Sequence, residues 1–158
     1  MTQREDVARA LAFFEETEDV MLLHRLLAEV APRARRMVGQ LLAEGGDEAI
    51  PPPAELRAAR SPATQDQALK TLRTVNDFAL LQVLTRAIGQ RVEAAEIAAS
   101  AEFPEGARVR VPQKVAFPPR GGFAEGVVEV TGTQLSVRLD NGETWEGPPT
   151  LARLAPRA

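Results

Sequence analysis

The stretch ARVRV (107–111) begins a change of pattern that decides the fold. Before it, apolar side chains recur every three or four residues, which is the spacing of amphipathic helices. From it onward they alternate with polar side chains, as they do again in QLSVRL (134–139), and this is the period of a strand with one buried face. The sequence therefore predicts an α+β protein with a helical domain over 1–102 and a β domain over 103–158.

The β domain is expected to hold five strands. Asn141-Gly142 is the strongest short hairpin signal, because both residues tolerate positive φ, and Pro148-Pro149 end the strand that follows. A strand, a long loop, a three-stranded meander and a short last strand together predict a small closed antiparallel barrel. Besides ARVRV and QLSVRL, the expected strands lie in FAEGVVEV (123–130), ETWEG (143–147) and LARLA (151–155).

This arrangement resembles the small Src-homology-3-like (SH3-like) barrels, in particular the KOW and Tudor types. GARVRV, GFAEGVVEV, LSVRLDNGETWEG and the proline-bounded turn into LARL carry the resemblance, all within 104–156. EGVVEVTGTQLSVRLDNG is also similar to the opening meander of the initiation-factor-type oligonucleotide-binding barrel, which stays open as the rival fold. The strand and long loop before the meander favour the first family.

The resemblance implies that partners bind at the loop after the first strand and on the surface beside it. Here that loop is PQKVAFPPRGG (112–122). Trp145 is either a core side chain or a partly exposed anchor, because neither face of ETWEG is clearly apolar. A Tudor-type aromatic cage is disfavoured, since the chain has no tyrosine and one tryptophan. The candidate partner-binding residues are Phe117, Arg120, Phe123, Arg138 and Trp145.

The helical domain is expected to contain three helices, over about 3–16, 19–44 and 62–101, with a proline-rich linker at 45–61. Pro32 lies inside the second helix and predicts a kink or break near 29–31. Ser61-Pro62 is typical of an N-cap followed by proline at the first helical position. From Phe78 to Leu84 the third helix is apolar almost all round, which predicts an antiparallel bundle completed by a second copy of the chain.

The composition and motifs of the chain exclude several kinds of functional site. The 158 residues include no cysteine and one histidine, so disulfides, thiolate metal sites, cysteine nucleophiles and histidine-rich metal sites are excluded. No GxxxxGK, no GxGxxG after a strand, no GxSxG and no HExxH occurs. Arg25, Arg33, Arg35 and Arg36 form the densest basic cluster, but they spread around a helix, as solvated side chains do. We therefore expect a non-enzymatic protein with no cofactor and no metal.

The expected function is that of an interaction or adaptor protein. Its helices would pack or self-associate as a dimer, and its barrel would recognise a protein partner. The alternative is a nucleic-acid-associated factor that binds DNA or RNA through the slightly basic barrel, although the net charge of −3 argues against an unspecific polyanion binder. With no run of 18 apolar residues and no signal-peptide core, we expect a cytoplasmic protein, of bacterial type, that makes no membrane contact.

Overall fold

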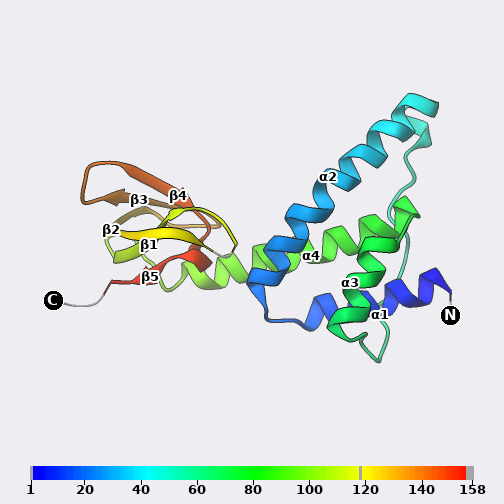
Figure 1. The fold of residues 1–158 in the computed structure, drawn as a ribbon, viewed down its shortest axis with the longest axis horizontal. Helices are drawn as coiled ribbons and strands as arrows, with labels where there is room; N and C mark the ends of the chain where they lie inside the picture. The colour runs from blue at the N-terminus through cyan, green and yellow to red at the C-terminus, as the bar shows by residue number, and fades with distance from the viewer. Residues whose placement is uncertain (1, 118, 156–158) are drawn as a thin grey trace. The chain divides into compact units, whose positions relative to one another are not determined.

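A computed structural model gives the fold and describes residues 2–117 and 119–155. These residues form four α-helices and a five-stranded antiparallel sheet, which confirms the α+β prediction (Figure 1). The chain divides into two compact units, Met1–Arg91 and Val92–Ala158, which we call the helical unit and the sheet unit. Among the residues that the structure describes, no helix is both long enough and apolar enough to cross a bilayer.

The first two helices are α1 (Gln3–Glu16) and α2 (Val20–Gly45). Thr2 and Glu5 form a capping box at the start of α1, and the Asp19 carboxylate accepts the backbone N–H of Leu22 to cap α2. The predicted break at Pro32 is wrong, because α2 continues through this residue. Pro32 is exposed, so water can solvate the carbonyl whose helical donor it removes.

The single helix predicted over 62–101 is two helices, α3 (Gln65–Thr74) and α4 (Phe78–Ser100). Thr64 and Gln67 form a capping box, so α3 starts there and not at Ser61-Pro62.

The gap between the two helices is closed by hydrogen bonds at both ends. Asp77 Oδ1 accepts the N–H groups of Ala79 and Leu80 at 2.9 and 3.3 Å and caps α4. The guanidinium of Arg33, on α2, donates to the carbonyls of Leu72 and Val75 at the end of α3. The break therefore satisfies backbone groups that a helix end leaves free.

The proline-rich linker is an ordered strap along the helical unit. It begins with the 3₁₀ helix η1 (Gly46–Ala49) and then runs without regular structure as far as Ala63. Its backbone is tied down by hydrogen bonds from the N–H groups of Ala54 and Ala59 to the carbonyls of Ala79 and Ala8, and from the guanidinium of Arg4 to the carbonyl of Glu55.

The core of the helical unit is built from all four helices, and α1 packs against α3. Within Phe78–Leu84, the side chains of Phe78, Leu80, Leu81 and Leu84 are all buried by the chain itself. This stretch therefore does not need a second copy to cover it. Other fully buried side chains of the unit are Val7, Phe14, Leu23, Leu26, Leu72, Val75 and Ile88.

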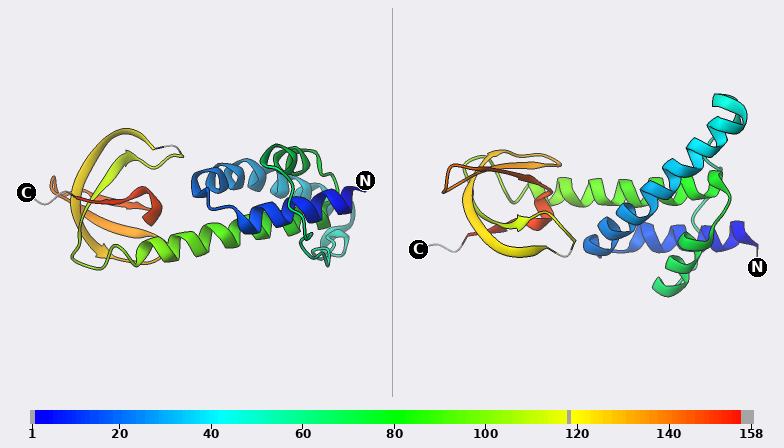
Figure 2. Two further views of the ribbon diagram at one scale, coloured as in Figure 1. Left: turned by 90° about the horizontal axis from the view of Figure 1, so that it is seen from below. Right: turned by 45° about the horizontal axis from the view of Figure 1, so that its top comes forward.

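The sheet unit has the strand order β4-β3-β2-β1-β5, with every neighbouring pair antiparallel. The sheet curves strongly (Figure 2), but in the part of the chain that the structure describes β4 and β5 are edge strands with no pairing between them, so the predicted closed barrel is wrong. The last expected strand, 151–155, is shorter than predicted, because Leu151 belongs to the 3₁₀ helix η2 (Pro149–Leu151) and only Arg153–Leu154 pair as a strand. The strands are β1 (Arg108–Lys114), β2 (Arg120–Val130), β3 (Leu135–Leu139), β4 (Thr144–Gly147) and β5 (Arg153–Leu154).

The long loop predicted over 112–122 is mostly strand. β1 and β2 pair as far as Lys114 and Arg120, with an irregular register between Pro112 and Lys114. Pro112 has no N–H to give to a ladder, so an irregularity at this place is expected.

The core of the sheet unit lies on the inner face of the sheet. Glu96, near the end of α4, is also buried, and its carboxylate accepts the backbone N–H (2.9 Å) and the hydroxyl of Thr150 at η2. A buried carboxylate is tolerated where hydrogen bonds satisfy it. The main apolar core residues are Phe103, Val109, Val111, Val128, Leu135, Val137, Trp145 and Leu151.

We expect Gly126→Ala to destabilise the sheet unit by about 3 kcal/mol or more. A Cβ at Gly126 would lie 2.3 Å from the carbonyl oxygen of Arg138 on β3, so the two strands would have to move apart. The matched control is Gly132→Ala, where the nearest atom is 3.8 Å away and the change should stay within about 0.5 kcal/mol. Denaturant unfolding followed by the fluorescence of Trp145, the single tryptophan, measures both. Equal midpoints for the two variants would contradict this account of the β2–β3 contact.

Candidate protein-interaction surface

One face of the sheet points to solvent and carries charged and apolar side chains together. We call it the outer face. Successive side chains of a strand point to opposite sides, and the residues between those of the outer face, such as Val109 and Val128, are buried. The outer face is made by Arg108 and Arg110 of β1, Phe123, Glu125, Val127 and Glu129 of β2, and Arg138 of β3, with Asp140 just after it.

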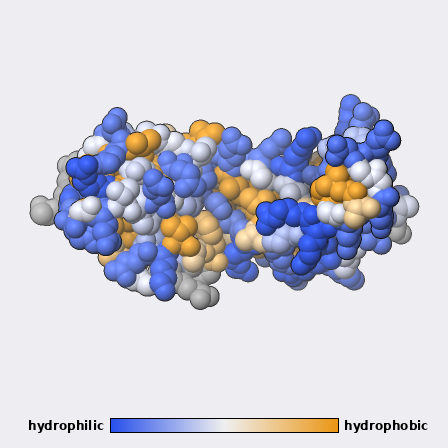
Figure 3. All heavy atoms as spheres, turned by 90° about the horizontal axis from the view of Figure 1, so that it is seen from above, coloured by the Kyte–Doolittle hydropathy of each residue, from blue (hydrophilic) through white to orange (hydrophobic). Residues whose placement is uncertain are grey.

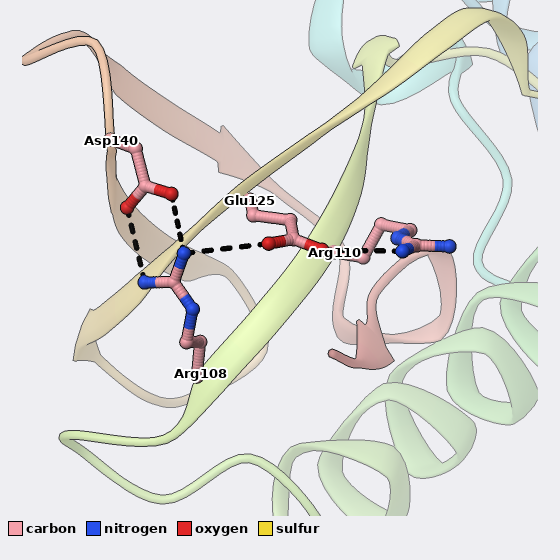
Figure 4. Close-up of polar contacts among 4 residues, drawn as sticks. All are labelled: Arg108, Arg110, Glu125 and Asp140. Carbon is pink, nitrogen blue, oxygen red and sulfur yellow. Dashed lines mark hydrogen bonds and ion pairs between the residues drawn. The ribbon is translucent and has the colours of Figure 1, made fainter. Parts of the chain in front are cut away.

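Four of these residues form a continuous charge network (Figure 4). Arg108 donates to both carboxylate oxygens of Asp140, with Nη1 3.1 Å from Oδ1, and its Nη2 also lies 3.4 Å from Oε2 of Glu125. Nη2 of Arg110 lies 3.2 Å from the other oxygen of Glu125. Glu125 is therefore held between two guanidinium groups, and the network joins β1, β2 and the end of β3.

The network shifts two pKa values. The hydrogen bond from Arg108, followed by the attraction of its charge, lowers the pKa of Asp140 below its ordinary value, while desolvation opposes the shift. The hydrogen bond to Asp140 likewise raises the pKa of Arg108. Both groups are exposed, and ion pairs in water contribute little to stability. The network therefore fixes the arrangement of charge on the outer face more than it holds the fold.

Arg138 is also paired. Its Nε lies 2.6 Å from Oε1 of Glu129 on the neighbouring strand, and both side chains are exposed. Lys114 and Arg153 are exposed as well. The side chain of Arg120, a predicted partner-binding residue, lies outside the part of the chain that the structure describes. The three arginines of the outer face are thus each matched by a carboxylate.

The apolar part of the outer face lies on β2. Phe123 is 50% exposed and Val127 is 38% exposed, and they share a face with Glu125 between them. Phe117, the other aromatic residue of the predicted surface, is half-buried in the connection between β1 and β2. On the side of the molecule seen in Figure 3, apolar side chains form separate small patches among hydrophilic ones.

Trp145 is a core residue, so the interpretation as a partly exposed anchor is wrong. Only 6% of it is exposed, and its indole N–H donates to the carbonyl of Pro112 at 2.9 Å. A Cβ at Gly147 would lie 2.7 Å from the indole ring, so glycine is needed there to make room for it. Its neighbours Thr144 and Glu146 are exposed, which the ambiguous pattern of ETWEG did not reveal.

The structure therefore brings together two of the five predicted residues, Phe123 and Arg138, on the outer face. Trp145 lies on the opposite side of the sheet. The prediction did not include Glu125 and Asp140, which complete the surface. The alternation of Arg108 and Arg110 with apolar residues indicated that both arginines lie on one face of β1. The carboxylates that they meet follow only from the pairing of β1 with its neighbours. In the described residues, no three acidic or histidine side chains are grouped as a metal site.

Comparison with known proteins identified no related protein. No protein-family model matches the sequence, and neither the curated proteins nor the solved structures gave a match.

We expect Trp145→Phe to destabilise the sheet unit, because it leaves the buried carbonyl of Pro112 without its donor. Such an unpaired buried group costs about 1–3 kcal/mol. Thr144→Ala, at an exposed position of the same strand, is the matched control and should change stability by no more than about 0.5 kcal/mol. Because Trp145 is the single tryptophan, unfolding is followed by circular dichroism. A variant as stable as the wild type would show that the indole hydrogen bond does not hold the sheet.

We expect the carboxyl group of Asp140 to titrate below its ordinary pKa in the folded protein and to return toward it in Arg108→Gln. A lowered folded pKa means that the pair stabilises the fold above the unfolded pKa, and that this contribution is lost as pH falls through the folded pKa. Carboxyl-carbon NMR titration measures the shift, with Arg138→Gln as the matched control that should leave Asp140 unchanged. An unshifted Asp140 in the wild type would contradict the network.

Proposed function

We propose that this chain is a non-enzymatic interaction protein in which the sheet unit is an SH3-like module that binds another protein through its outer face. The helical unit serves packing and self-association. The SH3-like assignment is supported by the order of elements that carried the resemblance: a first strand, a connection, the meander β2-β3-β4, and a short β5 that pairs with β1. The rival oligonucleotide-binding barrel does not account for β1 ahead of the meander.

The observation that carries the proposal is Phe123, a half-exposed aromatic ring among charges that are already paired. Interfaces between proteins are enriched in aromatic side chains and arginine, and a few such residues supply most of the binding energy. Phe123 with Val127 offers an apolar centre, and the Arg108–Asp140 and Arg138–Glu129 pairs offer a polar rim. This combination suits a protein surface with both apolar and mixed charged groups.

The same pairs weigh against nucleic acid as the partner. Binding to phosphates gains its free energy by replacing counterions with several convergent cationic side chains. On the outer face, Glu125 and Asp140 already neutralise Arg108 and Arg110, and a phosphate placed there would approach two carboxylates. A factor that binds DNA or RNA through this face is therefore the weaker alternative.

Affinity capture from lysate of the source cells, followed by mass spectrometry, tests the proposal with the full tagged chain. We expect Phe123→Asp to lose a protein retained by the wild type, with the affinity for the purified partner lowered by at least about tenfold, as at an interface hot spot. Ile97→Asp, at a similarly exposed apolar residue on α4, is the matched control and should retain the partner. A partner held equally by wild type and Phe123→Asp would overturn the assignment to the outer face.

The same preparations decide the alternative. If the outer face bound nucleic acid, affinity for single- or double-stranded probes would fall steeply with added salt, and Arg138→Ala and Arg120→Ala would weaken it. That result, with no protein captured, would replace the proposed function.

A further inference from the structure

The first part of β2 has a neighbouring strand on one side only. β1 pairs with β2 as far as Arg120, whereas β3 pairs with it only as far as Gly126. After β3, the N–H of Asp140 donates to the carbonyl of Glu125 at 3.0 Å, beside the charge network of Figure 4, and the chain then turns back into β4. Before Glu125, the side of β2 that faces away from β1 therefore carries no strand from the part of the chain that the structure describes.

The direction of each backbone group on this part of β2 follows from the pairing. Along an antiparallel strand, successive residues point their N–H and carbonyl groups to alternate sides. The N–H of Val128 donates to the carbonyl of Ala107, toward β1, and the carbonyl of Glu125 accepts from Asp140, away from β1. The register of β1 and β2 does not shift between these residues and Phe123. The N–H and carbonyl of Phe123 and the N–H of Glu125 thus point away from β1, and within the described residues none of the three has a hydrogen-bond partner.

We call residues 121–125 the open edge. Proteins usually protect a free edge with charged side chains, proline or a very short strand, because an unprotected edge pairs readily with another chain. The other two edges of the sheet follow this rule: β4 carries the exposed Glu146 and ends at Pro148-Pro149, and β5 has only two residues. The open edge instead begins with GGFA (121–124), which has neither charge nor proline.

The open edge has room for one short extended segment. Gly121 has a φ of +81°, and with Gly122 it lies opposite Gln113 alone, so a β-bulge ends the regular pairing there. At the other end, the carbonyl of Glu125 is already bonded. Phe123, between these limits, is 50% exposed and lies on the outer face. The unpaired backbone groups and the exposed aromatic ring are therefore at the same place.

We propose that the open edge binds an extended segment of the partner protein, which joins the sheet as a strand beside β2. An extended main chain offers an acceptor and a donor for Phe123 and a further carbonyl for the N–H of Glu125, at the spacing of a strand. The side chain of the partner residue opposite Phe123 would share the outer face with its ring, so we expect an aromatic or β-branched residue there. The inference rests on the proposed function and specifies the form in which the partner binds.

Amide hydrogen exchange of the full chain, followed by NMR, tests whether the edge is open. The amides of Phe123 and Glu125 should exchange at least about tenfold faster than those of Ala124 and Gly126, which point toward β1. Equal protection of the four amides would overturn the proposal. Protection of Phe123 and Glu125 that grows with protein concentration would also overturn it, because the edge would then pair with a second copy of the chain.

A display library of short random linear peptides, selected on the full chain, supplies the probe for binding. A selected peptide should slow the exchange of the Phe123 and Glu125 amides. N-methylation of one central peptide residue should lower its affinity by at least about tenfold, and N-methylation of either neighbour should not, because alternate N–H groups of a strand point away from β2. A library without a peptide that protects these amides, or a scan without this alternation, would overturn the proposal.

Two variants at one position separate the backbone from the ring. Phe123→Ala removes the ring and keeps the N–H, whereas Phe123→Pro removes both; neither breaks a bond to β1, because the N–H of Phe123 points away from it. The peptide should bind Phe123→Pro at least about tenfold more weakly than Phe123→Ala. Circular dichroism checks that both variants are folded. Equal affinities would show that the N–H does not take part and would overturn the added strand.

The captured protein distinguishes this inference from the proposed function. A protein that is lost with Phe123→Asp, but leaves the amides of Phe123 and Glu125 in fast exchange, would overturn the added strand and leave the outer face as the binding surface. A protein held equally by the wild type and Phe123→Asp, together with a peptide that protects the two amides, would overturn the proposed function and leave the added strand.

Discussion

The sheet unit depends on the hydrogen bond from the indole of Trp145 to the carbonyl of Pro112. β4 and β1 are not neighbours in the sheet, since β3 and β2 lie between them. The indole of β4 can reach the carbonyl of β1 only if the sheet curves so that its inner face encloses the indole ring. An antiparallel sheet that does not close into a barrel therefore still acquires a packed interior, and Gly147 makes room for the ring that fills it.

The same contact sets up the outer face. Pro112 lies opposite Phe123 in the β1–β2 register, so holding Pro112 also holds the part of the hairpin that carries the aromatic ring. The ion pairs around it are exposed and add little to folding stability. The buried contacts lie on the inner side of the sheet and the exposed ion pairs on the outer side, so the two can vary separately.

Much of the fold follows from the period of the apolar residues. The switch near 107 predicts where helices give way to strands, and it does so because one-sided burial imposes the period of each structure. The break between α3 and α4 was not predicted, although Asp77 before an apolar run is an N-cap signal, because half of its cause is Arg33, far away in the sequence. Thr64 with Gln67 was a local capping signal that the nearby Ser61-Pro62 obscured.

The candidate surface could be predicted only in part, because a sequence gives the alternation within a strand but not the register between strands. Phe123 was identified from its position after the loop. The side of the sheet on which Trp145 lies could not be predicted, because neither face of ETWEG is clearly apolar. The charge network is a property of register: Arg110 meets Glu125 because the two residues are paired across β1 and β2. No pattern within either strand contains that information.

The two units differ in the spacing of their oppositely charged surface side chains. On the sheet, arginines and carboxylates of adjacent strands neutralise one another over short distances. In the second half of α2, Arg35 and Arg36 are exposed and lie about two turns from Glu44, too far to meet it along one helix, given the ~1.5 Å rise per residue. Charges that meet no partner on their own helix are satisfied by water, so the fold does not depend on them.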